Sequence, residues 1–233
     1  MEMVRFENVS RTYQVGNHIL NALDGVDVSI EEGKFVVILG PSGAGKSTFL
    51  NLLGGLDSPT DGKIIVDQLD ISKLTQNELA DYRASKVGFV FQFYNLIPTL
   101  TVYENIALVK EIAPNALDPL EMLSRVGLLD HQNHFPSELS GSEQQRVSIA
   151  RALAKNPKVI LCDEPTGALD SKTGVKILEL LLEMCKENHK TIIVVTHNQN
   201  IAKIADIVIR IKNGKIHSME KQNHPMNVNE VEW

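Results

Sequence analysis

Four short stretches of the chain are apolar at nearly every position rather than at alternate ones. Strands that are buried on both faces of a parallel sheet have this pattern, because neither face meets water. Polar residues follow each stretch, at the strand ends where ligands bind in open α/β sheets. The pattern predicts parallel strands at residues 35–39, 87–91, 159–162 and 191–196.

A second set of segments alternates between apolar and polar residues, as half-buried strands do. These segments are residues 4–9, 26–30 and 63–66. They predict an antiparallel sheet around the glycine-rich loop at residues 40–48, with Gly25 as a break before the second segment. Residues 207–211 and 215–216 are joined by a short turn and predict a hairpin at the edge of the parallel sheet.

Residues 95–156 lack the strand patterns of their flanks and are expected to form a helical insertion. Helix-compatible segments lie at residues 102–112 and 117–126, separated by Pro114 and Gly127. We therefore expect one domain over residues 1–220, with residues 1–94 and 157–220 forming the core and the antiparallel subdomain. The polar residues 221–233 are expected to be a loosely ordered tail.

A glycine-rich motif directly follows the first apolar run, at residues 40–48. This stretch consists of Gly40, Pro41, Ser42, Gly43, Ala44, Gly45, Lys46, Ser47 and Thr48. Its pattern is G-x-x-x-x-G-K-S between a strand and a helix, in which glycines let backbone N–H groups face phosphate oxygens. We expect Lys46 to reach the β- and γ-phosphates and Ser47 to bind Mg²⁺. A turn that is glycine-rich only for steric reasons would not need Lys-Ser, so this is a nucleoside triphosphate site.

Two acids follow the strand at residues 159–162, and acids at the end of a buried strand need a reason to be there. We expect Asp163 to hold Mg²⁺ directly or through water, and Glu164 to polarise the water that attacks the γ-phosphate. A strand end that only reaches solvent through a salt bridge is the alternative. The phosphate loop upstream favours the catalytic interpretation.

Gln92 and His197 follow two other predicted strands and are expected at the same edge of the sheet. An isolated Gln is usually a surface amide, but here it can contact the metal and the attacking water. A lone His is more often structural, but at this edge it can donate a hydrogen bond to a γ-phosphate oxygen.

Tyr13 lies between the first two alternating segments. It is either an aromatic of an exposed edge strand or a ring that stacks on adenine, since stacking holds a base without using its hydrogen-bonding edge.

A helix is expected to begin in the segment Leu139-Ser140-Gly141-Ser142-Glu143-Gln144-Gln145-Arg146. Ser140 with Glu143, and Ser142 with Gln145, both fit the capping-box pattern. The segment is therefore either a well-capped helix start or a helix start that binds phosphate. Asp170 precedes a later helix and fits an ordinary N-cap.

Composition excludes several classes of protein. The net charge of −6 argues against a nucleic-acid partner. The apolar runs are far shorter than the roughly 20 residues of a membrane-spanning helix, and residues 1–6 do not resemble an export signal. The two cysteines, Cys162 and Cys185, are expected to be reduced and packed as small hydrophobes.

With these motifs in order, the chain resembles the ATP-binding cassette ATPases, the nucleotide-binding subunits of ABC transporters, over nearly its whole length. The resemblance implies Tyr13 as the adenine-stacking residue, residues 40–48 as Walker A and Gln92 as the Q-loop. It also implies residues 139–144 as the signature, with Ser140, Gly141, Ser142 and Gln144 contacting nucleotide, and Asp163 and Glu164 as Walker B with its catalytic glutamate. Residues 168–170, which include Asp170, match the D-loop, and His197 matches the switch histidine.

The resemblance further implies an α/β P-loop NTPase core with a mainly parallel sheet, ATP and Mg²⁺ as cofactors, and a second copy of the chain across two ATP molecules. Its other partners would be transmembrane permease subunits, which would hold it peripherally at the cytoplasmic face of the membrane. Residues 89–101 and 164–170 look like the bacterial exporters for lipoprotein release, macrolide export and antimicrobial-peptide resistance. The alternative is a regulatory or soluble cassette. The signature departs from the usual Gly-Gly at Ser142.

Overall fold

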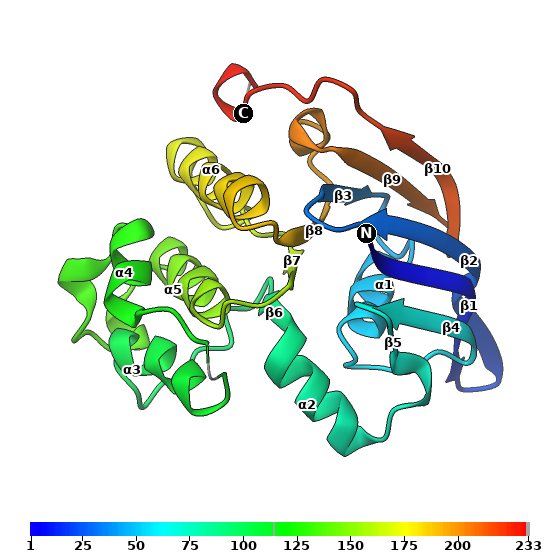
Figure 1. Cartoon of the computed structure of the whole chain (residues 1–233), viewed down its shortest axis with the longest axis horizontal. Helices are drawn as coiled ribbons and strands as arrows, with labels where there is room; N and C mark the ends of the chain where they lie inside the picture. Colours follow the sequence, from blue (N-terminus) through cyan, green and yellow to red (C-terminus); the bar gives the residue numbers. More distant parts are fainter. Residues whose placement is uncertain (114, 232–233) are drawn as a thin grey trace.

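The computed structural model describes residues 1–113 and 115–231, which form two β-sheets with helices around them (Figure 1). In the larger sheet, five strands run parallel and the edge strand β10 is antiparallel to its neighbour. In spatial order the strands are β10 (Lys215–Lys221), β9 (Ile207–Lys212), β3 (Phe35–Leu39), β8 (Thr191–Thr196), β7 (Val159–Asp163) and β6 (Val87–Val90). The predicted parallel sheet and its edge hairpin are confirmed.

The continuous apolar runs form this sheet because both of its faces are covered. Along β3, Val36 and Ile38 face one core cluster, which contains α1 (Lys46–Leu53) and the smaller sheet. The alternate residues Val37 and Leu39 face another cluster, which contains residues of α6 (Ser171–Glu187) and of the helices between residues 102 and 154. Since successive strand residues point to opposite faces, each of these strands needs apolar side chains throughout.

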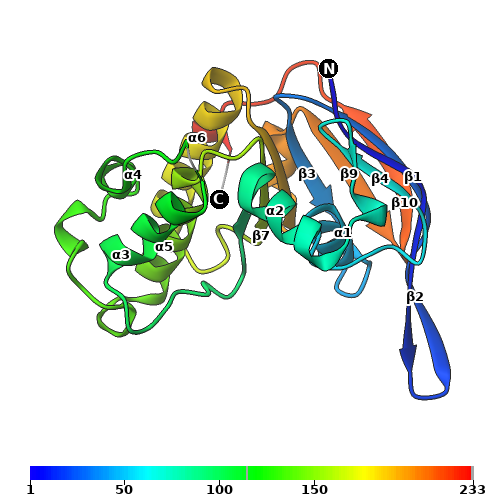
Figure 2. The ribbon, with the colours of Figure 1, turned by 60° about the horizontal axis from the view of Figure 1, so that its bottom comes forward.

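The smaller sheet is antiparallel, in the order β2 (His18–Glu31), β1 (Glu2–Val15), β4 (Asp61–Val66) and β5 (Leu69–Asp70). Its first two strands are much longer than predicted, and the tip of their hairpin projects from the body of the molecule (Figure 2). The expected break at Gly25 is wrong: β2 continues through it at a φ of 62°, and its N–H donates to Ser10 Oγ. The ladder absorbs the residue as an irregularity rather than ending there.

The helices divide into a group at the sheets and a lobe on the left of Figure 1. At the sheets lie α1, α2 (Gln76–Lys86) and α6 (Ser171–Glu187), and the lobe contains α3 (Val102–Ala107), α4 (Pro119–Arg125) and α5 (Gly141–Ala154). Short 3₁₀ turns occur at η1 (Ile71–Lys73), η2 (Leu108–Glu111), η3 (Leu129–His131), η4 (Pro136–Glu138), η5 (Ile201–Ile204) and η6 (Val228–Glu230).

The first helix predicted in this lobe is shorter than expected, because α3 passes into the 3₁₀ turn η2 after Ala107. The second corresponds to α4, with Asp118 as its N-cap and Pro119 in its first turn. The predicted separator Pro114 lies outside the described residues.

The expectation of a loose tail is wrong for residues up to 231. After β10 the chain crosses to α6, as the red segment of Figure 1 shows. There Val228 and Val231 are buried in the same core cluster as α6, and Asn229 Nδ2 donates to Glu179 Oε1 at 2.7 Å. Two buried valines and hydrogen bonds from Gln222, Met226 and Asn229 therefore hold a segment that is otherwise polar.

Both cysteines are free and buried, as expected. Among residues 1–113 and 115–231, no helix has the length and apolar character needed to cross a membrane.

Candidate active site

The strand ends at one edge of the larger sheet bring the predicted site together. Neighbouring strands are in register there: Leu39 pairs with Thr196, and Asp163 with Val195. The glycine-rich loop, His197 and the two acids therefore leave the sheet side by side, and β6 adds Gln92 from the next strand. Segments far apart in sequence meet because parallel strands all end at the same edge.

Close approach of backbone explains two glycines of the loop. A Cβ on Gly45, whose φ is 106°, would lie 2.3 Å from Ala22 O. A Cβ on Gly40 would lie 2.3 Å from Ile211 O. The loop is thus wedged between β2 and the β9–β10 hairpin, and only glycine fits at these positions.

Lys46 and Ser47 begin α1 directly after the loop. Lys46 Nζ donates to Gly40 O at 2.9 Å and to Pro41 O at 3.0 Å, so the ammonium lies across the loop. Ser47 Oγ donates to Asp163 Oδ2 at 3.1 Å. Burial raises the pKa of Asp163, and the neighbouring Glu164 charge adds to that effect, while Ser47 and Lys46 partly offset it.

Glu164 is held by the end of β8. Its Oε1 accepts from the His197 N–H at 3.0 Å and lies 2.7 Å from His197 Nδ1, while its Oε2 accepts from Thr196 Oγ1 at 2.9 Å. The backbone of Glu164 has a φ of 51°, which is unfavourable for residues other than glycine and asparagine. Its backbone N–H donates to Val195 O at 2.9 Å, so β8 fixes both the strained backbone and the carboxylate.

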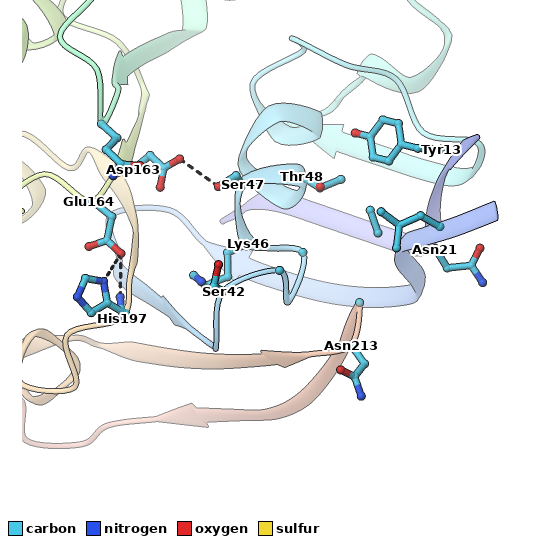
Figure 3. A pocket seen from close by; sticks show the side chains of 16 residues that line it. Tyr13, Asn21, Ser42, Lys46, Ser47, Thr48, Asp163, Glu164, His197 and Asn213 are labelled. Atoms are coloured by element: carbon cyan, nitrogen blue, oxygen red, sulfur yellow. Dashed lines mark hydrogen bonds and ion pairs between the residues drawn. The ribbon is translucent and has the colours of Figure 1, made fainter. Parts of the chain in front are cut away.

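These groups line one cleft of about 690 Å³ (Figure 3). Its lining includes the predicted residues Tyr13, Ser42, Gly43, Gly45, Lys46, Ser47, Thr48, Gln92, Asp163, Glu164 and His197. In Figure 3, Glu164 and His197 lie at one end and Tyr13 at the other. Gly40, Pro41 and Ala44 shape the loop without lining the cleft.

Sequence reasoning missed five residues of the lining: Leu20, Asn21, Ala22, Asn213 and Gly214. They come from β2 and from the β9–β10 turn, which is tied to the loop by the hydrogen bond from Gly214 N to Ala44 O at 3.0 Å. The sequence predicts only a short turn between residues 207–211 and 215–216, and nothing local indicates that this turn meets the loop.

The signature residues do not line this cleft. Ser140 caps α5, and it forms the predicted capping box with Glu143. Gly141, Ser142 and Gln144 lie in the first turn of that helix, where Gln144 Nε2 donates to Leu139 O at 3.2 Å. Asp170 is the N-cap of α6, and its side chain accepts from Thr173 N.

The second predicted capping box, between Ser142 and Gln145, is wrong. Gln145 points inward instead: it is 1% exposed, and its Nε2 donates to Pro165 O at 3.3 Å. It also lines a cavity of about 330 Å³ together with Gln92, Glu164 and His197. Gln145 therefore links the start of α5 to the segment after Glu164, a relationship that the capping pattern concealed.

A family model described as ABC transporter matches residues 23–167, which is more than half of the chain. The chain belongs to the ABC transporter family. Its ATPase class, implied by the order of the motifs, is thereby confirmed. The cassette is 47% identical over 232 residues to an uncharacterized ABC transporter ATP-binding protein of Methanocaldococcus jannaschii, covering 94% of this chain and 97% of that protein.

A solved structure described as a dimeric post-hydrolysis state of that M. jannaschii cassette, bound to ADP and phosphate, has a TM-score of 0.90 and 46% identity. The match covers 95% of this chain and 100% of the other, which confirms the predicted fold class. The cassette is also 44% identical to a macrolide export ATP-binding/permease protein of Campylobacter fetus, over 95% of this chain but only 35% of that protein. It thus spans about a third of that longer relative.

Proposed function

We propose that this cassette binds ATP with Mg²⁺ in the described cleft and hydrolyses it, and that two copies enclose two ATP molecules to drive membrane partners of an exporter. The observation that carries the proposal is the meeting of Lys46, Ser47–Asp163 and Glu164–His197 in one cleft. A cation, a hydroxyl–carboxylate pair and a second carboxylate are the groups that phosphoryl transfer to water requires.

The donor set fits Mg²⁺. Ser47 Oγ and Asp163 Oδ2 are hard oxygen ligands 3.1 Å apart, and Gln92 lines the same cleft. Among the described residues, no group of three or more His, Cys, Asp or Glu could hold a metal ion. An ion held by Ser47 and Asp163 would therefore take its other ligands from phosphates and water, as Mg²⁺ prefers. When bound, it would neutralise charge on the departing phosphoryl group.

The residues at the catalytic end divide the remaining work. Glu164 accepts a proton from the attacking water, and its fixed carboxylate orients that water. His197 positions Glu164 and is close enough to the cleft to donate to a γ-phosphate oxygen. Lys46 and the N–H groups of the loop hold the β- and γ-phosphates. Gln92 would contact the Mg²⁺ ion and the attacking water. Tyr13 stacks on the base at the opposite end.

The position of the signature residues supports a second copy as partner. Ser140, Gly141, Ser142 and Gln144 are at the start of α5, outside this chain's own cleft, with Ser140 and Gly141 exposed. A helix start with free N–H groups suits a phosphate oxygen. We propose that these residues, with Asp170 nearby in the assembly, contact the nucleotide of a partner subunit. The M. jannaschii cassette structures, described as dimers, support this arrangement.

Coupling to a permease is supported by the macrolide export relatives, whose printed names combine ATP-binding and permease functions in one protein. A transmembrane permease as partner would place the cassette at the cytoplasmic face of the membrane. Residues 95–156 would form the subdomain that passes motion to it. A regulatory or soluble cassette is not favoured by these relatives.

Phosphate release by the purified chain tests the ATPase part of the proposal. We expect release that requires both ATP and Mg²⁺ and that stops when the metal is chelated. Hydrolysis that continues with Mg²⁺ removed would contradict the assignment of Ser47 and Asp163.

Isolation of the tagged cassette from solubilised membranes tests the coupling. The exposed Phe93 lines the cavity beside Gln92 and is 79% exposed. We expect an integral membrane protein with a permease domain to co-purify, and Phe93→Asp to release it while phosphate release by the isolated cassette continues. Leu69→Asp, at the edge strand β5, is the matched control. Recovery of the cassette with soluble partners only would favour the alternative function.

A further inference from the structure

One face of the Tyr13 ring is covered by a cation. The guanidinium carbon of Arg11 lies 4.6 Å from the ring centroid, within the range of a cation–π contact. The two residues are two positions apart on β1, so their side chains share a face of the strand. Tyr13 lines the cleft and Arg11 does not. The guanidinium therefore backs the ring, and one ring face is left for a ligand.

Asp57 holds both partners of this stack. Arg11 Nε donates to Asp57 Oδ2 at 2.9 Å, and Arg11 Nη2 lies 2.8 Å from Asp57 Oδ1. The Tyr13 hydroxyl donates to Asp57 Oδ2 at 2.7 Å. A bidentate arginine–carboxylate pair has a defined geometry. The contact from the Tyr13 hydroxyl to the same carboxylate restrains the rotation of the ring. The side chains of Arg11 and Asp57 are only 25% and 24% exposed, so solvent weakens these contacts less than at an open surface.

Asp57 also connects this cluster to the phosphate end of the cleft. It follows α1, and its N–H donates to Asn51 O at 3.3 Å within that helix. Since α1 runs from Lys46 to Leu53, this helix and the short turn after it join the phosphate-binding residues to the carboxylate that contacts Tyr13. The hydrogen bond to Asn51 ties that turn back to the helix.

We propose that Arg11 and Asp57 are positioning residues for the base of the nucleotide, a role that rests on the proposed ATP site. Asp57 holds the Tyr13 ring at its hydroxyl and Arg11 covers one face, so a purine stacks on the other face to give a guanidinium–ring–base stack. Fixing the ring in advance lowers the entropy lost when the base binds. The cation behind the ring polarises it, and a wide purine presents the largest surface to it.

The test compares two probes, ATP and inorganic tripolyphosphate, which shares the phosphates of ATP but has no base. Arg11→Met keeps the length of the side chain and removes the charge. We expect it to weaken ATP binding about threefold to tenfold, with binding of tripolyphosphate unchanged within about twofold. Asp57→Asn should act in the same direction, and kcat at saturating ATP should stay near the wild-type value in both variants.

Arg5→Met is the matched control, because Arg5 lies on the same strand and pairs with Glu2 and Glu7 away from the cleft. It should leave both affinities unchanged. Arg11→Lys retains a charge but not the planar fork, so its ATP affinity should fall between those of the wild type and Arg11→Met. If thermal unfolding shows that Arg11→Met is destabilised, Arg11→Lys still tests the inference.

The outcomes separate this inference from the proposed function. Weakened ATP binding in Tyr13→Ala with wild-type affinity in Arg11→Met and Asp57→Asn would overturn the positioning role alone. Equal losses for ATP and tripolyphosphate in Arg11→Met would also overturn it, because the effect would then lie in the phosphate loop. Wild-type ATP affinity in Tyr13→Ala would instead contradict the base site on which the inference rests.

Discussion

Glu164 and His197 are joined through a single carboxylate oxygen. Oε1 of Glu164 lies 2.7 Å from His197 Nδ1 and accepts from the His197 backbone N–H at 3.0 Å. The other oxygen accepts from Thr196. The orientation of this carboxylate is therefore set by residues at the end of β8 rather than by its own strand.

Replacing His197 should slow hydrolysis without removing nucleotide binding. In His197→Ala, Glu164 loses its ring contact and the γ-phosphate loses a donor, so we expect kcat to fall about 100-fold and the ATP dissociation constant to change less than about threefold. Steady-state phosphate release and equilibrium titration measure the two quantities. The exposed His217 on β10 supplies the control His217→Ala, with wild-type values expected. A normal kcat in His197→Ala would refute this role.

Replacing Lys46 should affect binding and hydrolysis together. Its ammonium lies over the loop, held by two carbonyls, where it can serve both the ground state and the charge that develops in the transition state. For Lys46→Ala we expect at least about a tenfold loss of ATP affinity and about a 100-fold loss of rate. A fluorescent ATP analogue measures the affinity. Lys34→Ala, at the opposite end of β3, is the control and should keep the wild-type affinity and rate. Unchanged affinity and rate in Lys46→Ala would be incompatible with this loop as a phosphate site.

The unusual Ser142 should have a small effect on activity. Its Oγ lies 3.2 Å from Ser140 Oγ, but the capping box of α5 is formed by Ser140 and Glu143 and survives without it. We expect Ser142→Gly to change the ATPase rate by less than about tenfold, or about 1.4 kcal/mol. Rates measured against protein concentration detect a change in dimer strength. A hundredfold gain in the glycine variant would show that Ser142 impairs the natural site.

Lys155 should make stability depend on pH in the alkaline range. Burial, with a smaller contribution from the charge of Arg83, lowers its pKa from 10.5 to about 8, although its Nζ donates to the backbone carbonyls of Arg83 and Val87. Between these two pKa values the unfolded chain binds the proton more tightly, so the free energy of unfolding increases as pH rises from about 8 to about 10.5. Below about pH 8 the full cost of the buried charge remains.

Urea unfolding at about pH 7 and about pH 10 tests this expectation. The wild type should gain about 1 kcal/mol more than Lys155→Met over this range, a value reduced for partial exposure of the amine. Lys172→Met, at an exposed position of α6, should keep the wild-type dependence. Identical slopes for the wild type and Lys155→Met would show that the amine titrates normally.

The sequence predicted which edge of the sheet carries the cleft because the signals for it are local. Residues 35–39 and 159–162 are apolar runs followed directly by polar residues. Parallel strands place such ends at the same edge of the sheet, whatever the loops between them. The same reasoning predicted His197 at this edge, where it lines the cleft. These residues needed only the pattern of their own strand.

The features that the sequence did not predict depend on contacts between distant segments. Arg11 and Asp57 are 46 positions apart, and neither has a local pattern that indicates the other. Gln145 fits a capping box as well as Glu143 does, and only the packing of α5 against the segment at Pro165 turns it inward. Val228 and Val231 are isolated apolar residues in a polar stretch, so their burial against α6 follows from where β10 ends.

In the proposed mechanism, two copies of this chain close around ATP, and Glu164 then promotes hydrolysis. Glu164→Gln keeps the shape of the side chain but cannot accept the proton, so the closed state should accumulate. We predict that this variant, mixed with ATP and Mg²⁺, elutes from gel filtration as a dimer with two ATP molecules and releases almost no phosphate. Adding Lys46→Ala should restore the monomer. A Glu164→Gln protein that stays monomeric with ATP and releases phosphate at the wild-type rate would contradict the account.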